Sequence, residues 1–101
     1  MKFTKKDLHF KDYSWAADGG DNPHYKGDLD KEKVDKTEGY EVVYFCNDFL
    51  VTYDKELTKE NFQKIERLLR EELFRKIEKR SELNKSIYEY WNFIEMKNKY
   101  K

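Results

Sequence analysis

The sequence predicts a mainly α-helical single domain, residues 1–101, in which a three-helix body follows an irregular, aromatic N-terminal arm. All four glycines and the only proline lie between positions 19 and 39, so residues 40–101 contain no helix breaker. Apolar residues in that region recur at three- and four-residue spacing, which is typical of amphipathic helices. Charged residues make up 42% of the chain, but the formal net charge is zero and aromatic residues reach 17%, which favours a folded chain over a disordered one.

The arm, residues 1–35, carries apolar side chains that would be costly to leave in water. They are Phe3, Leu8, Phe10, Tyr13 and Trp15. We therefore expect the arm to pack across the helical body, residues 36–101, with Trp15 in a groove.

The first expected helix covers about residues 36–54, and a β-hairpin at 40–53 is the alternative. This stretch is rich in β-branched and aromatic residues and is split by an Asn-Asp pair, as in a hairpin. The spacing of the polar residues favours the helix, because it places all of them on one strip. They are Glu38, Glu41, Asp48, Thr52 and Lys55. Asp35 together with Glu38 also resembles a capping box at the start of this helix.

Two further helices are expected at about 58–79 and 81–97. Thr58 and Ser81 are residue types that cap helix N-termini well. The apolar positions of the middle helix are Phe62, Ile65, Leu69, Leu73 and Ile77. Those of the last helix are Leu83, Ile87, Tyr90, Trp91 and Ile94.

Charge is distributed unevenly along the chain. Residues 1–57 carry nine basic and thirteen acidic side chains, a net charge of −4, whereas residues 58–101 carry twelve and eight, a net charge of +4. A basic half is one mark of a nucleic-acid-binding protein, which makes this the alternative function. However, Lys64, Arg67 and Arg75 share their helix face with Glu60, Glu71 and Glu78. Such a mixed face is more typical of a solvated helix.

The segment 16–30 gathers aspartates, a histidine and three glycines, which makes it a candidate for a ligand site. A calcium loop needs oxygen ligands at positions 1, 3 and 5, a glycine at 6 and a glutamate at 12. No register that starts at Asp18, Asp21 or Asp28 provides them, and His24 has too few neighbouring ligands for a transition metal. The glycines fit neither phosphate-binding fingerprint. We predict no metal, no cofactor and no catalytic residue, and we interpret the segment as a series of polar turns.

The single cysteine, Cys46, excludes an intramolecular disulfide, and it lies in the most apolar run of the chain, where cysteine is usually inert packing. No apolar run is as long as a membrane span, and the first ten residues, MKFTKKDLHF, lack the apolar stretch of a signal peptide. The sequence thus predicts a soluble cytoplasmic protein with no membrane segment.

Five features occur in one order: Trp15, GDNPH at 20–24, GDLD at 27–30, EGYEVVYFCN at 38–47 and KIERLLR at 64–70. In this arrangement the chain resembles small uncharacterised proteins encoded in phages and prophages of enteric bacteria. That group tends to have a proline or glycine between its last two helices, whereas residues 71–82 have neither. The resemblance implies a helical structure for the aromatic segment at 38–47, an accessory genome context, and no particular activity.

The sequence carries no catalytic signature, so we predict a small non-enzymatic accessory protein that acts by binding another protein. The candidate contacts are Trp15, Asp21, His24, Tyr25 and Asp28. Binding of nucleic acid by the basic C-terminal helices is the alternative. The oligomeric state stays open, and a homodimer is one of the states considered.

Overall fold

The computed structural model describes residues 2–15 and 33–99, with the backbone alone described for the last of these. The described part of the chain contains a short 3₁₀ turn, η1 (Lys5–Asp7), and three α-helices, α1 (Gly39–Thr52), α2 (Lys59–Leu68) and α3 (Arg80–Lys99). Two isolated β-bridges occur in these residues, and no sheet. The predicted mainly helical class with three helices is confirmed, and helix α1 excludes the hairpin alternative at 40–53.

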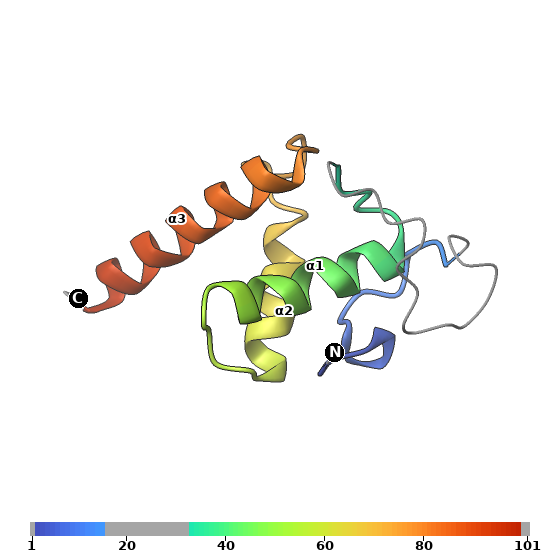
Figure 1. Cartoon of the computed structure of the whole chain (residues 1–101), viewed down its shortest axis with the longest axis horizontal. Coiled ribbons are helices and arrows are strands. Elements are labelled where there is room, and N and C mark those ends of the chain that lie inside the picture. The colour runs from blue at the N-terminus through green and yellow to red at the C-terminus, as the bar shows by residue number, and fades with distance from the viewer. Residues whose placement is uncertain (1, 16–32, 100–101) are drawn as a thin grey trace.

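Helix α1 lies at the centre and packs across α2, while α3 lies to one side of the pair and its C-terminal end extends away from it (Figure 1). The core is built from apolar side chains of all three helices and of the arm. Its members with no measurable exposure are Cys46, Phe49, Leu50, Phe62, Ile65, Leu83 and Ile87. Because aromatic rings fill much of this volume, a short chain rich in charge still forms a continuous core.

Helix α1 begins and ends at recognisable signals. Its N-cap is Glu38, whose carboxylate accepts from the Tyr40 amide, so the helix starts later than the predicted residue 36. Asp35 instead closes a turn before the helix, where its carboxylate accepts from the amide and hydroxyl of Thr37. At the other end, the Lys55 amide donates to the Leu50 carbonyl over 2.8 Å, and Asp54 has a positive φ of 52°. This is a Schellman ending with aspartate in the place where glycine is commonest.

The polar strip that predicted α1 does not lie entirely in water. Glu38 and Glu41 are buried, at 7% and 9% exposure. Glu41 accepts from the Asp35 amide over 3.2 Å, and its carboxylate lies 3.8 Å from the guanidinium of Arg80 at the start of α3. The polar residues at the N-terminal end of α1 therefore join elements together.

The middle helix is shorter than expected, so the predicted range of 58–79 was wrong at its C-terminal end. Thr58 caps α2 as predicted, through its hydroxyl and the Asn61 amide, but the helix ends at Leu68. Residues 69–76 form a series of turns, in which the Glu71 amide donates to the Leu68 carbonyl three residues earlier. Leu73, predicted to be in the core, is 66% exposed, and Phe74 is buried in its place.

Tertiary hydrogen bonds account for these turns. The ammonium of Lys36 donates to the backbone carbonyls of Arg75 and Ile77, and the Val34 amide donates to the Glu78 carbonyl over 2.8 Å. These donors take carbonyls that a continuous helix would have paired internally. Burial lowers the pKa of Lys36 from its usual value, the effect expected when an ammonium is withdrawn from water into such a site.

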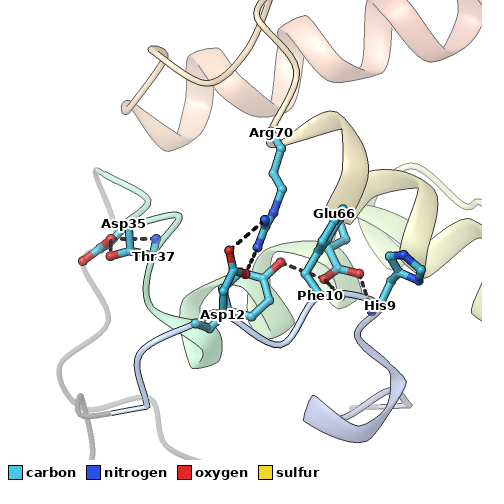
Figure 2. A network of polar contacts seen from close by, with 8 residues as sticks. His9, Phe10, Asp12, Asp35, Thr37, Glu66 and Arg70 are labelled. Atoms are coloured by element: carbon cyan, nitrogen blue, oxygen red, sulfur yellow. Dashed lines mark hydrogen bonds and ion pairs between the residues drawn. The ribbon is translucent and has the colours of Figure 1, made fainter.

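The described part of the arm is fastened to α2 by a buried carboxylate (Figure 2). Glu66 has no measurable exposure, and its two oxygens accept three hydrogen bonds from the arm. The donors are the amide of His9 at 2.8 Å, the amide of Phe10 at 3.1 Å and the hydroxyl of Tyr13 at 2.7 Å. Hydrogen bonds to a charged group are stronger than neutral ones, so this cluster is a principal attachment of the arm.

Arg70, one turn beyond Glu66, holds the next part of the arm. Its guanidinium forms a two-pronged ion pair with Asp12, one contact of which measures 3.1 Å, and it lies 3.8 Å from the ring centre of Phe10 and 4.9 Å from that of Tyr13. The hydrogen bonds to Arg70 hold the pKa of Asp12 below its ordinary value. The arm thus approaches α2 with its aromatic rings and backbone donors together (Figure 2).

The two ends of the described arm are fixed on α1. Phe3 exchanges hydrogen bonds with the side-chain amide of the buried Asn47, each 3.0 Å long. Ser14 accepts from the Gly39 amide, and the ring of Trp15 lies against Gly39 so closely that a Cβ there would be 2.3 Å from a ring carbon. The described residues of the arm pack on the helical body, as expected, and Trp15 is partly buried against the core.

Replacement of Gly39 by alanine is expected to destabilise the protein. Alanine at a helical position is normally favourable by about 1 kcal/mol, but the overlap with Trp15 is an overpacking that costs about 1–3 kcal/mol. Urea unfolding should show a net loss for Gly39→Ala, and the loss should shrink in a Trp15→Leu background, where the clashing ring is gone. An equal loss in both backgrounds would contradict this account.

Stability should fall at alkaline pH as Tyr13 ionises. Burial, and then the hydrogen bond to Glu66, raise the pKa of Tyr13 above its usual value of 10.0. A raised pKa means that the folded state retains the proton more strongly than the unfolded state. The contribution of Tyr13 to the free energy of unfolding is therefore complete below pH 10 and is lost as the pH rises further. The free energy of unfolding should therefore decline less steeply above pH 10 in Tyr13→Phe than in wild type, with a constant difference between pH 6 and 8 as the internal control. If the free energies of unfolding of wild type and Tyr13→Phe fall in parallel above pH 10, the ionisation of Tyr13 does not cause the loss.

Candidate protein-binding surface

The sequence-predicted contact residues do not come together in a described site. Trp15 packs edge-on against Tyr40, with the ring centres 4.9 Å apart, so its ring is committed largely to the fold. The other four lie outside the described residues: Asp21, His24, Tyr25 and Asp28.

Helix α3 uses one of its sides in the core. Leu83, Ile87 and Trp91 are buried at exposures of 0–2%, as their spacing predicted. The indole of Trp91 lies 5.8 Å from the ring centre of Phe49 on α1. These contacts fix which side of α3 faces the body and which faces solvent.

Cations and aromatic rings hold the flank of α3 next to this buried side. Lys64 of α2 lies 4.0 Å from the ring centre of Trp91, and Lys55 lies 5.5 Å from the same ring and 3.9 Å from Glu95. The Trp91 indole N–H donates to Glu95 over 2.5 Å. Tyr88 also stacks on Tyr53 at 4.2 Å. The orientation of α3 about its own axis is therefore well defined.

The opposite side of α3 presents two large apolar side chains to solvent. Phe93 and Met96 are each 60% exposed, and their three-residue spacing makes them neighbours on the helix surface. Glu89 precedes Phe93 by one turn and Lys97 follows it by one turn, and both are exposed. We call these four residues, Glu89, Phe93, Met96 and Lys97, the α3 patch.

The other exposed apolar side chains are scattered over separate elements. Val51 lies at the end of α1, Leu57 precedes α2, and Leu73 lies in the turn region. Single exposed apolar residues are ordinary on protein surfaces, whereas adjacent ones more often mark a contact surface. The α3 patch is thus the strongest candidate for binding within the described residues.

Two adjoining cavities, of about 490 and 370 Å³, lie between the arm, the start of α1 and the turns after α2. They share Lys36, Thr37 and Arg75. The larger one is lined by three basic and three acidic side chains, and Lys36 already donates to backbone carbonyls while Arg75 pairs with Glu72. The basic and acidic side chains of this lining balance, so it does not favour a ligand of either charge. Its polar groups form hydrogen bonds and ion pairs within the protein.

No group of three or more His, Cys, Asp or Glu side chains within 2–15 and 33–99 is placed to hold a metal ion. Cys46 is fully buried, and burial, followed by the nearby charge of Glu66, raises the pKa of its thiol well above the usual value, so the thiol stays protonated. Among the described helices, none has the length and apolar character that crossing a membrane requires.

Sequence reasoning missed the α3 patch. The predicted apolar face of the last helix contains residues 83, 87, 90, 91 and 94, and it leaves out both Phe93 and Met96. The available signal was these two apolar residues on the side that also carries Glu89. An apolar pair on the polar side of an amphipathic helix is the pattern that would have identified it.

Comparison of the chain with protein-family models, with curated proteins and with solved structures finds no match in any of the three.

Substitutions in the α3 patch should leave the fold intact. Phe93→Gln and Met96→Gln remove side chains that are mostly in water, so the free energy of unfolding should change by no more than about 0.5 kcal/mol. Ile87→Ala, on the buried side of the same helix, should cost about 2–5 kcal/mol. Urea unfolding of the three variants provides the comparison, and a large loss for Phe93→Gln would show that this ring belongs to the core.

Proposed function

We propose that the protein is a cytoplasmic, non-enzymatic binding protein whose partner is another protein, and that it binds through the α3 patch. The observation that carries this proposal is the exposure of Phe93 and Met96 side by side on a helix whose other side is fixed in the core. Aromatic and methionine side chains are enriched where proteins bind one another. Burying such a pair supplies much of the energy of a small interface.

The charges of the α3 patch favour a partner that presents an amphipathic helix. Along α3 the order is acidic, apolar and basic, from Glu89 through Phe93 to Lys97. A helix with an apolar centre between a basic and an acidic turn would meet each of these with its complement. Helix-on-helix docking of this kind uses anchors at three- and four-residue spacing, which is the spacing of the α3 patch.

Nucleic-acid binding, the alternative, has less support. It relies on the cations of residues 58–101, and at least four of them are engaged within the protein. Lys64 lies on the ring of Trp91. Arg70, Arg75 and Arg80 each lie beside a carboxylate. The resemblance to small phage and prophage proteins stays a prediction, and it names no partner.

Site-specific photo-crosslinking tests this proposal. Phe93 is replaced by p-benzoylphenylalanine, and Val51, which is 70% exposed on α1, is replaced in the same way as the matched control. We expect a crosslinked protein at position 93 and not at position 51. The captured partner, identified by mass spectrometry and purified, should bind wild type at least tenfold more tightly than Phe93→Gln. It should bind wild type and Val51→Gln equally.

Two results would contradict the proposal. One is crosslinking of the same proteins with equal yield at both positions, which would indicate random encounters. The other is binding of the purified partner that is unchanged by Phe93→Gln, since the patch would then have no part in recognition.

A further inference from the structure

We infer that the partner of the α3 patch is a second copy of this chain, bound with the two α3 helices antiparallel and with the symmetry axis beside Phe93. This inference rests on the proposed function, because it uses the same surface. It adds the identity of the partner and the orientation of the contact.

The argument starts from the ridge that residues four apart form on a helix. Glu89, Phe93 and Lys97 make up one such ridge, and all three are exposed. In the commonest helix packing, ridges of this kind interdigitate, each lying in the groove beside the other, at an interaxial angle of about 50°. Met96 lies in the adjoining row and is available to fill the groove beside the ridge.

The charges of Glu89 and Lys97 determine whether the two α3 helices pair antiparallel or parallel. When the second ridge runs antiparallel, Phe93 meets Phe93 of the other copy, Glu89 meets its Lys97, and Lys97 meets its Glu89. When the second ridge runs parallel, each charge meets its like, which is unfavourable. The single sequence of acidic, apolar and basic residues is thus self-complementary in one direction only. A symmetric dimer requires such a self-complementary surface.

The C-terminal part of α3 also stands clear of the rest of the molecule. Every side chain from Glu95 to Asn98 is exposed, whereas Trp91 one turn earlier is 2% exposed. In Figure 1 this end of α3 extends beyond α1 and α2 towards the C-terminus. A second helix can therefore approach the α3 patch without meeting the helical body.

The contact is small, and this sets the expected affinity. About two helical turns from each copy would meet, which is below the size of a standard stable interface. We expect a weak dimer with a dissociation constant of about 10⁻⁵ to 10⁻⁴ M.

Charge exchange tests the inference by sedimentation equilibrium between 10 and 500 µM. Glu89→Lys alone sets Lys against Lys twice in the antiparallel dimer, and Lys97→Glu alone sets Glu against Glu twice. Each should weaken the dimer about tenfold. An equimolar mixture of the two variants should restore it as a heterodimer, because both ion pairs are then re-formed, one as in wild type and the other with its two charges exchanged.

Three controls accompany the measurement. Phe93→Gln should abolish the dimer. Glu60→Lys on α2 changes the net charge by the same amount as Glu89→Lys and should leave the dimer intact. Urea unfolding checks that every variant is folded. A wild type that stays monomeric at 500 µM would overturn the inference, as would a mixture of the charge variants that associates no better than each alone.

The two proposals fail differently. If wild type is monomeric but a different protein is bound in a Phe93-dependent way, the proposed function stands and the dimer is excluded. If a dimer forms and persists in Phe93→Gln, the α3 patch is not its interface and the inference is overturned, while the Phe93 crosslinking result decides the proposed function by itself.

Discussion

The carboxylate of Glu66 is the group on which the arrangement of the chain depends. A charged side chain with no exposure to water is costly unless its oxygens find donors inside the protein. Here all three observed donors come from the arm, at His9, Phe10 and Tyr13. The arm therefore satisfies a charge that α2 could not bury alone. Conversely, the same carboxylate gives the irregular backbone of the arm the partners that a strand or helix would otherwise have provided.

The helical fold was readable from the sequence because its causes are local. Breakers are confined to residues 19–39, Thr58 is a good cap, and the spacing from Leu83 to Trp91 marks a buried side. The burial of Glu66 was not readable, since a glutamate in an amphipathic helix normally faces water and its donors lie more than fifty residues away. The end of α2 at Leu68 was missed for the same reason: the donors that replace its helical bonds come from Lys36 and Val34.

The exposure of Phe93 and Met96 depends on how far α3 extends relative to the elements that pack against it. The sequence of α3 alone does not give this information. Helix α3 extends to Lys99, but α1 ends at Thr52, and the neighbours that cover α3 do not follow it to its end. Phe93 and residues 95–98 are therefore left with solvent around them, whatever their own hydrophobicity. Periodicity identifies the side of a helix that is suited to burial, whereas the partner elements decide how much of that helix is buried.

The order in which the chain is made gives the attachment of the arm a further consequence. Phe3, His9 and Asp12 find their partners 44, 57 and 58 residues later in the sequence. A ribosome adds roughly 5–20 residues per second, N-terminus first, so these segments wait for several seconds until Asn47, Glu66 and Arg70 exist. During that interval Phe3 and Leu8, buried in the finished molecule, remain open to any chaperone that binds apolar nascent chain. Each of these arm residues is thus made well before the residue that it contacts in the folded protein.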